Sequence, residues 1–193
     1  MGKVQIIKKS RKEQRCSKCG KVIPVGSRYY KGLLNFHPDI NRCTSCGLES
    51  WEVTTSDYQL QVGQIVYRWQ DTYGVGTNSA EDISSELESI RDELQDKLDN
   101  MPEQLQESDS GMLLQERIES LESAIDELEN IDIESLQESV LEECYETEDD
   151  EEVDWDELMD DESVDDETKY ELSNALDEKI SEEIESALSE INI

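Results

Sequence analysis

Apolar residues recur at helical spacing over most of the chain after residue 55. Residues 79–100, 112–130 and 168–191 each carry Leu or Ile every three or four positions, with acidic residues between them. This period places the apolar side chains on one face of a helix. Shorter stripes of the same kind predict helices over residues 56–71 and 134–145. The pattern therefore predicts that the chain is mostly α-helical beyond the first 55 residues.

The two central helices have similar lengths and are separated by a short polar connection. Residues 76–145 are therefore expected to form an acidic helical hairpin or coiled coil. Residues 56–75 are expected to form a connecting helix, although Gly63 weakens the helical propensity at its centre. Residues 168–193 are expected to form a C-terminal amphipathic helix.

The first 55 residues follow a different pattern. The segment KVQII at residues 3–7 predicts a short strand, and SRYYKGLLNF at residues 27–36 predicts a β-hairpin or ribbon. Two CxxC pairs, each followed by glycine, are separated by 23 residues and consist of Cys16, Cys19, Cys43 and Cys46. We therefore expect residues 1–55 to form a small, separate module organised around these cysteines.

Four thiols in two CxxC turns are typical of a tetrahedral zinc site. Because sulfur fills all four positions, no position stays open for water, so we expect one structural Zn²⁺ and no catalytic metal. Reduced cysteines in a small core, a disulfide pair and an iron–sulfur cluster are the alternatives. His37, the only histidine, is expected to be a surface residue, and Cys144 a free thiol.

Charge is distributed unevenly along the chain, whose net charge is −33. Residues 1–50 contain 11 basic and 3 acidic residues, a net charge of +8. Residues 51–193 contain 6 basic and 47 acidic residues, a net charge of −41. Residues 146–167 carry 15 acidic residues in 22 and no basic one, so we expect them to be an extended or disordered linker.

The basic N-terminal segment suits contacts with the phosphates of nucleic acid. Base stacking on exposed tyrosines would extend this to single strands. The alternatives are that the cations only keep the module soluble, or that they pair with the acidic half of the chain. The candidate nucleic-acid-binding residues are Lys8, Lys9, Arg11, Lys12, Arg15, Lys18, Tyr29 and Tyr30.

The remaining motifs indicate no enzyme. The sequence has no glycine-rich phosphate loop and no GxSxG motif, and its single histidine is too few for a zinc-bracketed HNH nuclease. No small-molecule substrate is evident. The sequence has no apolar run long enough to span a membrane and no secretory signal, so a cytoplasmic protein is expected, in the host cytoplasm if it is viral.

Two stretches resemble known families. CSKCGKVIPVGSRYYKG, residues 16–32, resembles the start of PARP-type zinc fingers, in which an IPxGS turn and a β-ribbon follow the CxxC knuckle. That family closes its site with a histidine and one cysteine, whereas Cys43 and Cys46 stand in those positions here. KKSRKEQRCSKCG together with residues 98–132 resembles uncharacterised phage- and prophage-encoded zinc-finger proteins. This second resemblance implies a viral or mobile-element origin and an interaction role for the helical hairpin.

The sequence thus predicts a small α+β protein. Its zinc-ribbon or treble-clef module is followed by an acidic coiled-coil hairpin and an acidic C-terminal helix. The leading hypothesis is a non-enzymatic adaptor or regulator that binds DNA or RNA through the zinc module and binds itself or a partner protein through the hairpin. The alternative is a protein–protein scaffold or an acidic mimic of nucleic acid, with a purely structural zinc.

Overall fold

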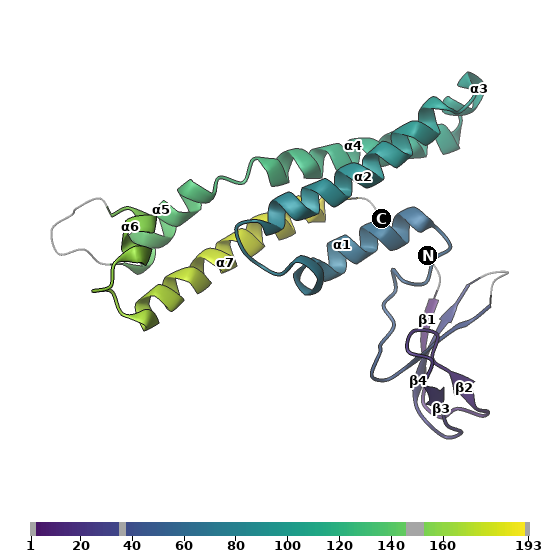
Figure 1. The fold of residues 1–193 in the computed structure, drawn as a ribbon. Helices are drawn as coiled ribbons and strands as arrows, with labels where there is room; N and C mark the ends of the chain where they lie inside the picture. The colour runs from purple at the N-terminus through teal and green to yellow at the C-terminus, as the bar shows by residue number, and fades with distance from the viewer. Residues whose placement is uncertain (1–2, 35–37, 146–152, 192–193) are drawn as a thin grey trace. The chain divides into compact units, whose positions relative to one another are not determined.

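A computed structural model describes residues 3–34, 38–145 and 153–191 of the chain. They divide into two compact units, one formed by the described residues up to Gln64 and the other by those from Ile65 onward. The first unit contains the β-strands and the second is helical, so the protein is of the α+β class (Figure 1). No helix in these residues is both long and apolar enough to cross a bilayer.

The first unit is built on two antiparallel β-sheets. The three-stranded sheet has the order β1-β4-β5 and consists of β1 (Lys3–Ile7), β4 (Tyr29–Leu33) and β5 (Ile40–Cys43). The two-stranded sheet pairs β2 (Gln14–Arg15) with β3 (Val22–Ile23). In the sheet, Tyr29 pairs with Ile7 on one side and with Cys43 on the other.

The two faces of β4 pack against different groups. Tyr29 is buried with Cys16 and Ile23 in a small cluster, and Ile7, Cys43 and Cys46 pack against it. On the opposite face, Gly32 leaves room for apolar side chains, since a Cβ there would lie 3.0 Å from Val53 Cγ2 and 3.2 Å from Leu48 Cδ2. The sheet is thus covered by the cysteine cluster on one face and by the segment after β5 on the other.

Helix α1 (Asp57–Tyr73) begins where the sequence predicts, with the backbone N–H of Gln59 donating to Ser56 Oγ at 3.4 Å. Gly63, which weakens the helical propensity of this segment, lies against the indole of Trp51. A Cβ at Gly63 would approach Trp51 Cε3 to 2.6 Å, so this position must be glycine for the ring to pack. The helix is kinked at Arg68, whose φ of −141° and ψ of 18° are not helical.

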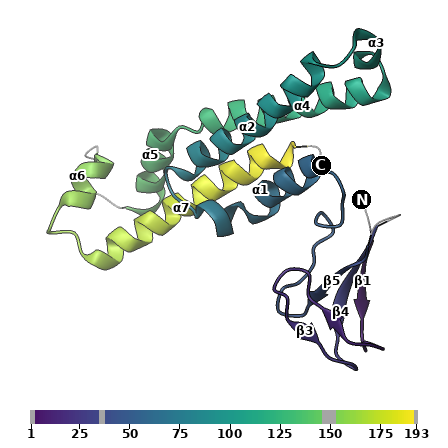
Figure 2. The same cartoon turned by 45° about the vertical axis from the view of Figure 1, so that its right-hand side comes forward.

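The second unit contains the predicted helical hairpin. Its long arms are α2 (Ser79–Asp99) and α4 (Asp109–Glu129), which lie side by side, with the single turn α3 (Glu103–Gln106) at one end (Figures 1 and 2). The arms are antiparallel, since Ser84 Oγ near the start of α2 donates to Glu129 Oε1 at the end of α4, at 3.4 Å. Most residues of the predicted stripes are buried: Ile83, Leu87, Ile90, Leu94 and Leu98 of α2, and Ile118, Leu121, Ile125 and Leu128 of α4. Leu114, which the pattern also places on the α4 stripe, is half-buried, and Ala124 of α4 is buried in addition.

Three more helices complete this unit: α5 (Ile133–Cys144), α6 (Trp155–Asp160) and α7 (Asp166–Ser189). Each is preceded by an N-cap aspartate, whose carboxylate accepts a hydrogen bond from the backbone N–H three residues later, at 2.9 to 3.1 Å. The last helix packs onto the unit, because Lys179 Nζ of α7 lies 2.8 Å from Glu143 Oε1 and 3.0 Å from Ser139 Oγ of α5. Gln70 of α1 also reaches α7, donating to Ser181 Oγ at 3.2 Å.

The expectation that the acidic residues 146–167 are extended or disordered is wrong for part of this segment. Residues 155–160, in the segment expected to be extended or disordered, form α6, and Leu158 in this helix is 5 % exposed. Burial of this leucine and the cap at Asp154 outweigh the repulsion between neighbouring carboxylates. Residues 146–152 of the same segment lie outside the described residues.

Candidate metal centre

The first cysteine pair lies in a tight knuckle between β2 and β3. The backbone N–H of Cys16 donates to Lys21 O at 2.9 Å, and that of Gly20 donates back to Cys16 O at 2.9 Å. Gly20 has a φ of +70°, a left-handed conformation that glycine adopts without strain. The chain thus folds back on itself after Cys19, between β2 and β3.

The second pair repeats this geometry at the end of β5. The backbone N–H groups of Cys46 and Gly47 donate to Cys43 O at 3.1 and 3.2 Å, and Gly47 has a φ of +63°. The residues that follow form turns, with the N–H of Val53 donating to Ser50 O at 3.1 Å, and the next helix begins only at Asp57. Both pairs therefore come from knuckles at strand ends.

Hydrogen bonds between Ser17 and the strand β5 hold the two knuckles together. Ser17 donates to Asn41 O through its backbone N–H and through its hydroxyl, both at 2.8 Å. Arg42 Nη1 in turn donates to Ser17 Oγ at 2.7 Å, and Arg42 Nη2 lies 3.3 Å from Glu52 Oε1. The Arg42 and Glu52 side chains are 15 % and 11 % exposed, so this ion pair is better shielded from water than a surface pair.

These bridging residues were not predicted from the sequence. Ser17 is one of the two variable positions of a CxxC motif, and Arg42 was counted only as part of the basic charge. Nothing in the residue pattern distinguishes them from their neighbours, because their roles depend on contacts between segments 24 or more residues apart.

The four predicted ligands lie together. The Sγ atoms of Cys16, Cys19, Cys43 and Cys46 are all within 4.8 Å of one another, and those of Cys19 and Cys43 are 3.8 Å apart. A tetrahedral ion with metal–sulfur bonds of about 2.3 Å requires sulfurs about 3.8 Å apart. The cluster therefore has the size and the donor set of a four-coordinate metal site. It is the one such group of histidine, cysteine and carboxylate ligands within the described ranges.

The electrostatics of the cluster also fit a cation. Burial raises the pKa of the Cys16 thiol, but hydrogen bonds from the backbone amides of Cys19, Cys43 and Lys18 outweigh this effect and bring the pKa to about 6. A hydrogen bond from the Cys46 thiol lowers the pKa of Cys43. The same bond to Cys43, and a second to Cys19, raise the pKa of Cys46 to about 12. A bound divalent ion would displace the thiol protons, because the thiolate is the form of cysteine that binds metal.

Of the two other residues with a thiol or imidazole group, Cys144 and His37, the structure describes only Cys144. Cys144 is exposed on α5 and does not belong to the group. The prediction of a surface position for His37 concerns a residue outside the described ranges.

The candidate nucleic-acid residues fall into two sets. The predicted cations at positions 8, 9, 11, 12, 15 and 18 are all exposed. Tyr29, in contrast, is 6 % exposed and buried against the cysteines, so the expectation that it stacks on bases is wrong. It faces inward because it pairs directly with Cys43 in the sheet. Tyr30, on the other face of β4, is half-buried.

The fold and the site together define a small α+β protein with an N-terminal four-cysteine module, which fits a metal, and a separate helical unit. Comparison with models of protein families, with curated proteins and with solved structures finds no match to this chain.

Proposed function

We propose that the chain is a non-enzymatic zinc-binding protein that contacts nucleic acid through its basic first unit and a protein partner, or a second copy, through its helices. Such a protein acts as an adaptor or regulator. An origin in a virus or mobile element agrees with the resemblance of residues 8–20 and 98–132 to phage-encoded proteins.

The choice of zinc follows from the donor set. Four thiolates and a tetrahedral spacing favour Zn²⁺ over the hard cations Mg²⁺ and Ca²⁺, which prefer oxygen ligands. All four sulfurs would be used in binding, which leaves the ion a structural role. The ion would tie the first knuckle to the second, and so fix the strands that carry the basic residues.

The observation that carries the nucleic-acid assignment is the pairing state of the cations. In the helical unit, Arg91, Lys97 and Lys179 each form an ion pair with a carboxylate. In the first unit, Lys31 pairs with Asp39 and Arg42 with Glu52. The other nine basic residues of that unit are exposed and form no ion pair with a described residue: Lys3, Lys8, Lys9, Arg11, Lys12, Arg15, Lys18, Lys21 and Arg28.

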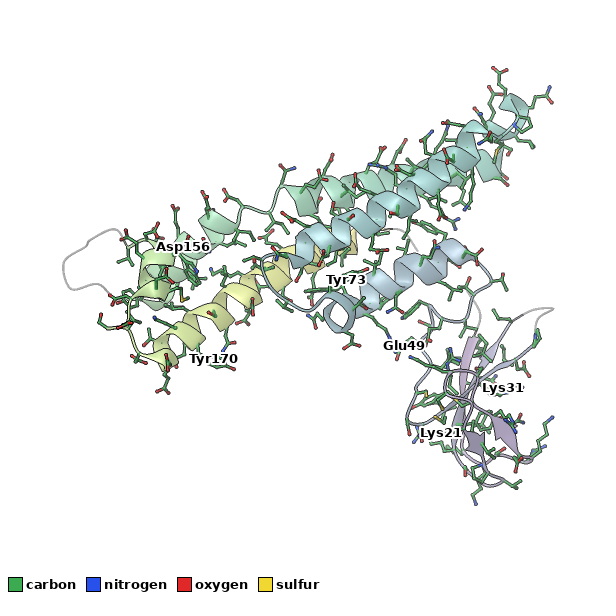
Figure 3. The ribbon with its side chains drawn as sticks, viewed as in Figure 1. Lys21, Lys31, Glu49, Tyr73, Asp156 and Tyr170 are labelled. Carbon is green, nitrogen blue, oxygen red and sulfur yellow. The ribbon has the colours of Figure 1, made fainter. Side chains whose placement is uncertain are left out.

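Figure 3 shows the two kinds of surface, with carboxylate oxygens along the helices and with Lys21 and Lys31 on the strand-bearing unit. Cations that form no ion pair with a described residue are available for phosphates, and their neutralisation of a polyanion releases condensed counterions. The carboxylates on the helices cannot bind phosphates, because both groups are negatively charged. The contact with nucleic acid is therefore assigned to the first unit alone.

One observation favours the second candidate function, a protein–protein scaffold. At the α3 end of the hairpin, Leu105, Met112 and Leu113 are exposed by 53 %, 56 % and 43 %. Exposed apolar side chains gathered on an otherwise acidic element are typical of a contact surface.

Measurement of metal content and nucleic-acid affinity on the same preparation tests the proposal. Elemental analysis of protein purified without added metal should give one zinc per chain. Fluorescence anisotropy with a labelled 20-base-pair duplex and with its separate strands should show binding that weakens steeply between 50 and 200 mM salt. Binding that is absent at 50 mM salt in zinc-loaded protein would refute the nucleic-acid role and leave the scaffold as the remaining candidate.

A pair of charge variants makes the test specific. Lys8→Glu/Lys9→Glu should abolish most of the binding, whereas Lys97→Glu/Lys169→Glu should leave the affinity within about twofold. Both variants change the net charge by the same amount, and the second alters only cations of the helical unit. Equal losses in the two variants would show a response to total charge and contradict a site on the first unit.

A further inference from the structure

All the cations of the first unit except Arg42 lie on one continuous hairpin. Its two arms run antiparallel from the pair Lys3 and Leu33 to the pair Arg15 and Val22, and the first cysteine knuckle closes its end. This segment, residues 3–33, is called the basic hairpin below. It carries ten lysines and arginines and a single acidic residue, Glu13, which gives it a net charge of +9.

A clamp at Ser10 joins the two arms between the ladders. The backbone N–H of Ser10 donates to Ser27 O at 2.8 Å, and Ser10 O accepts from the N–H of Gly26 at 2.8 Å. The hydroxyl of Ser10 donates to Lys12 O, and Ser10 itself is only 4 % exposed. The segment with the densest charge, Lys8–Lys12, is thus anchored at its centre while its four cations remain in solvent.

The opposite arm of the clamp is a turn that requires glycine. The N–H of Ser27 donates to Pro24 O at 3.2 Å, and Gly26 has a φ of +86° at the third position of this turn. These features define a type II turn, in which the third residue takes a left-handed conformation. No atom lies within 4 Å of a Cβ built at Gly26, so the backbone angle alone selects glycine here.

The basic hairpin offers cations but no free aromatic ring. Its two tyrosines are Tyr29, buried against the cysteines, and Tyr30, which is half-buried. The exposed apolar side chains are instead Ile6, Val22 and Val25, which have no π-face on which a base could stack. Proteins that bind single strands rely on stacking for about 1–3 kcal/mol per base. This surface lacks that contribution.

We propose that the basic hairpin binds the sugar–phosphate backbone of double-stranded nucleic acid, with Ser10 and Gly26 as positioning residues. This inference rests on the proposed function and specifies its ligand. Without stacking, affinity depends on phosphate density, and a duplex carries one charge per about 1.7 Å of its axis, twice the density of one strand. Cations held on a clamped ribbon also match a phosphate array of fixed geometry better than a flexible chain.

The first test compares a 20-base-pair duplex of mixed sequence with each of its strands, using the zinc-loaded full chain. We expect the duplex to bind at least tenfold more tightly, with little change when its sequence is shuffled. Equal or tighter binding of single strands would overturn this inference and leave the proposed function standing. No binding of any nucleic acid would overturn both.

The second test addresses the clamp through three glycine variants. Gly26→Ala should raise the duplex Kd about fivefold or more and reduce the steepness of its salt dependence, because fewer phosphates are engaged at once. Gly26→Asn should restore most of the affinity, since asparagine tolerates a left-handed φ. Gly74→Ala is the matched control, because Gly74 in the helical unit has a similar φ of +75° and also has open space at its Cβ.

Zinc content is measured for every glycine variant. An unchanged salt dependence in Gly26→Ala, with zinc retained, would refute the positioning role. If Gly26→Ala also loses zinc, the decision rests on Gly26→Asn with normal zinc content. Duplex affinity and salt dependence equal to those of the unaltered chain would support the positioning role. Weakened duplex binding would refute it.

Discussion

Removal of the metal is expected to unfold the cysteine module and to leave the helical unit folded. On the metal side of the sheet, Ile23 and Tyr29 are the large buried side chains, and their burial contributes only about 3–6 kcal/mol. A structural zinc in a small module contributes about 10–16 kcal/mol of apparent binding free energy at pH 7. A bound zinc would therefore be the larger stabilising contribution in this part of the chain.

Hydrogen exchange followed by mass spectrometry measures the effect segment by segment. Without metal, the knuckle amides that donate to Cys16, Lys21 and Cys43 carbonyls should lose protection. A loss of about 4 kcal/mol or more corresponds to exchange at least about 1,000-fold faster. Peptides from α2 and α4 should be unchanged, because their buried stripes pack against each other.

The perturbation is made in two ways, by a strong chelator and by Cys43→Ser/Cys46→Ser. Cys144→Ser is the matched control, since it removes a thiol outside the cluster and should alter neither zinc content nor exchange. Unchanged protection over residues 14–47 after complete metal removal would refute the reasoning. Loss of protection in α2 and α4 as well would refute the independence of the two units.

Three further predictions follow from single positions. Zinc affinity should rise at least tenfold per pH unit from pH 6 to 8, because the pKa of Cys46 is about 12 and zinc binding displaces its proton. Chelator competition measures this affinity, and a flat pH profile would contradict Cys46 as a ligand. Below pH 6 the slope should steepen, as Cys16 also binds a proton. Gly63→Ala should destabilise the first unit by about 1–3 kcal/mol through the Trp51 ring, as measured by denaturant unfolding; no change would mean that the ring moves aside freely. Gly111→Ala should cost more, because a Cβ there lies 2.1 Å from the backbone oxygen of Gln106; an unchanged Tm of the helical unit would refute this close approach.

The helices could be predicted because their stripes are long and regular. The expected start of α2 at residue 79 is confirmed, and the expected end of α4 at 130 lies one residue from the observed Glu129. The start of α4 was placed three residues late, since Gly111 was read as part of the connection. In the structure Gly111 lies inside the helix, where the turn α3 approaches it closely. A glycine selected by close packing cannot be distinguished by sequence from one that ends a helix.

The ligands could be predicted from the spacing of the cysteines, but the supporting contacts could not. The interaction of Arg42 with both Ser17 and Glu52 depends on how β5 lies beside the first knuckle. The burial of Tyr29 likewise depends on register, because a shift by one residue would have exposed it and buried Tyr30. The sequence pattern predicts that both tyrosines lie on a strand, but only the pairing of Tyr29 with Cys43 determines which of them faces the cysteine cluster.

The ion pairs of individual lysines and arginines show how the uneven charge of the chain could affect binding. Three cations of the helical unit, Arg91, Lys97 and Lys179, form ion pairs with carboxylates of the same unit, which weakens their attraction for an external anion. Nine cations of the first unit form no ion pair with a described residue, and eight of the nine lie in the stretch from Lys3 to Lys21. The acidic helices repel a polyanion. If the proposed function holds, this repulsion excludes phosphates from the helical surface, so nucleic acid can approach only the basic hairpin and the helices stay free for a protein partner.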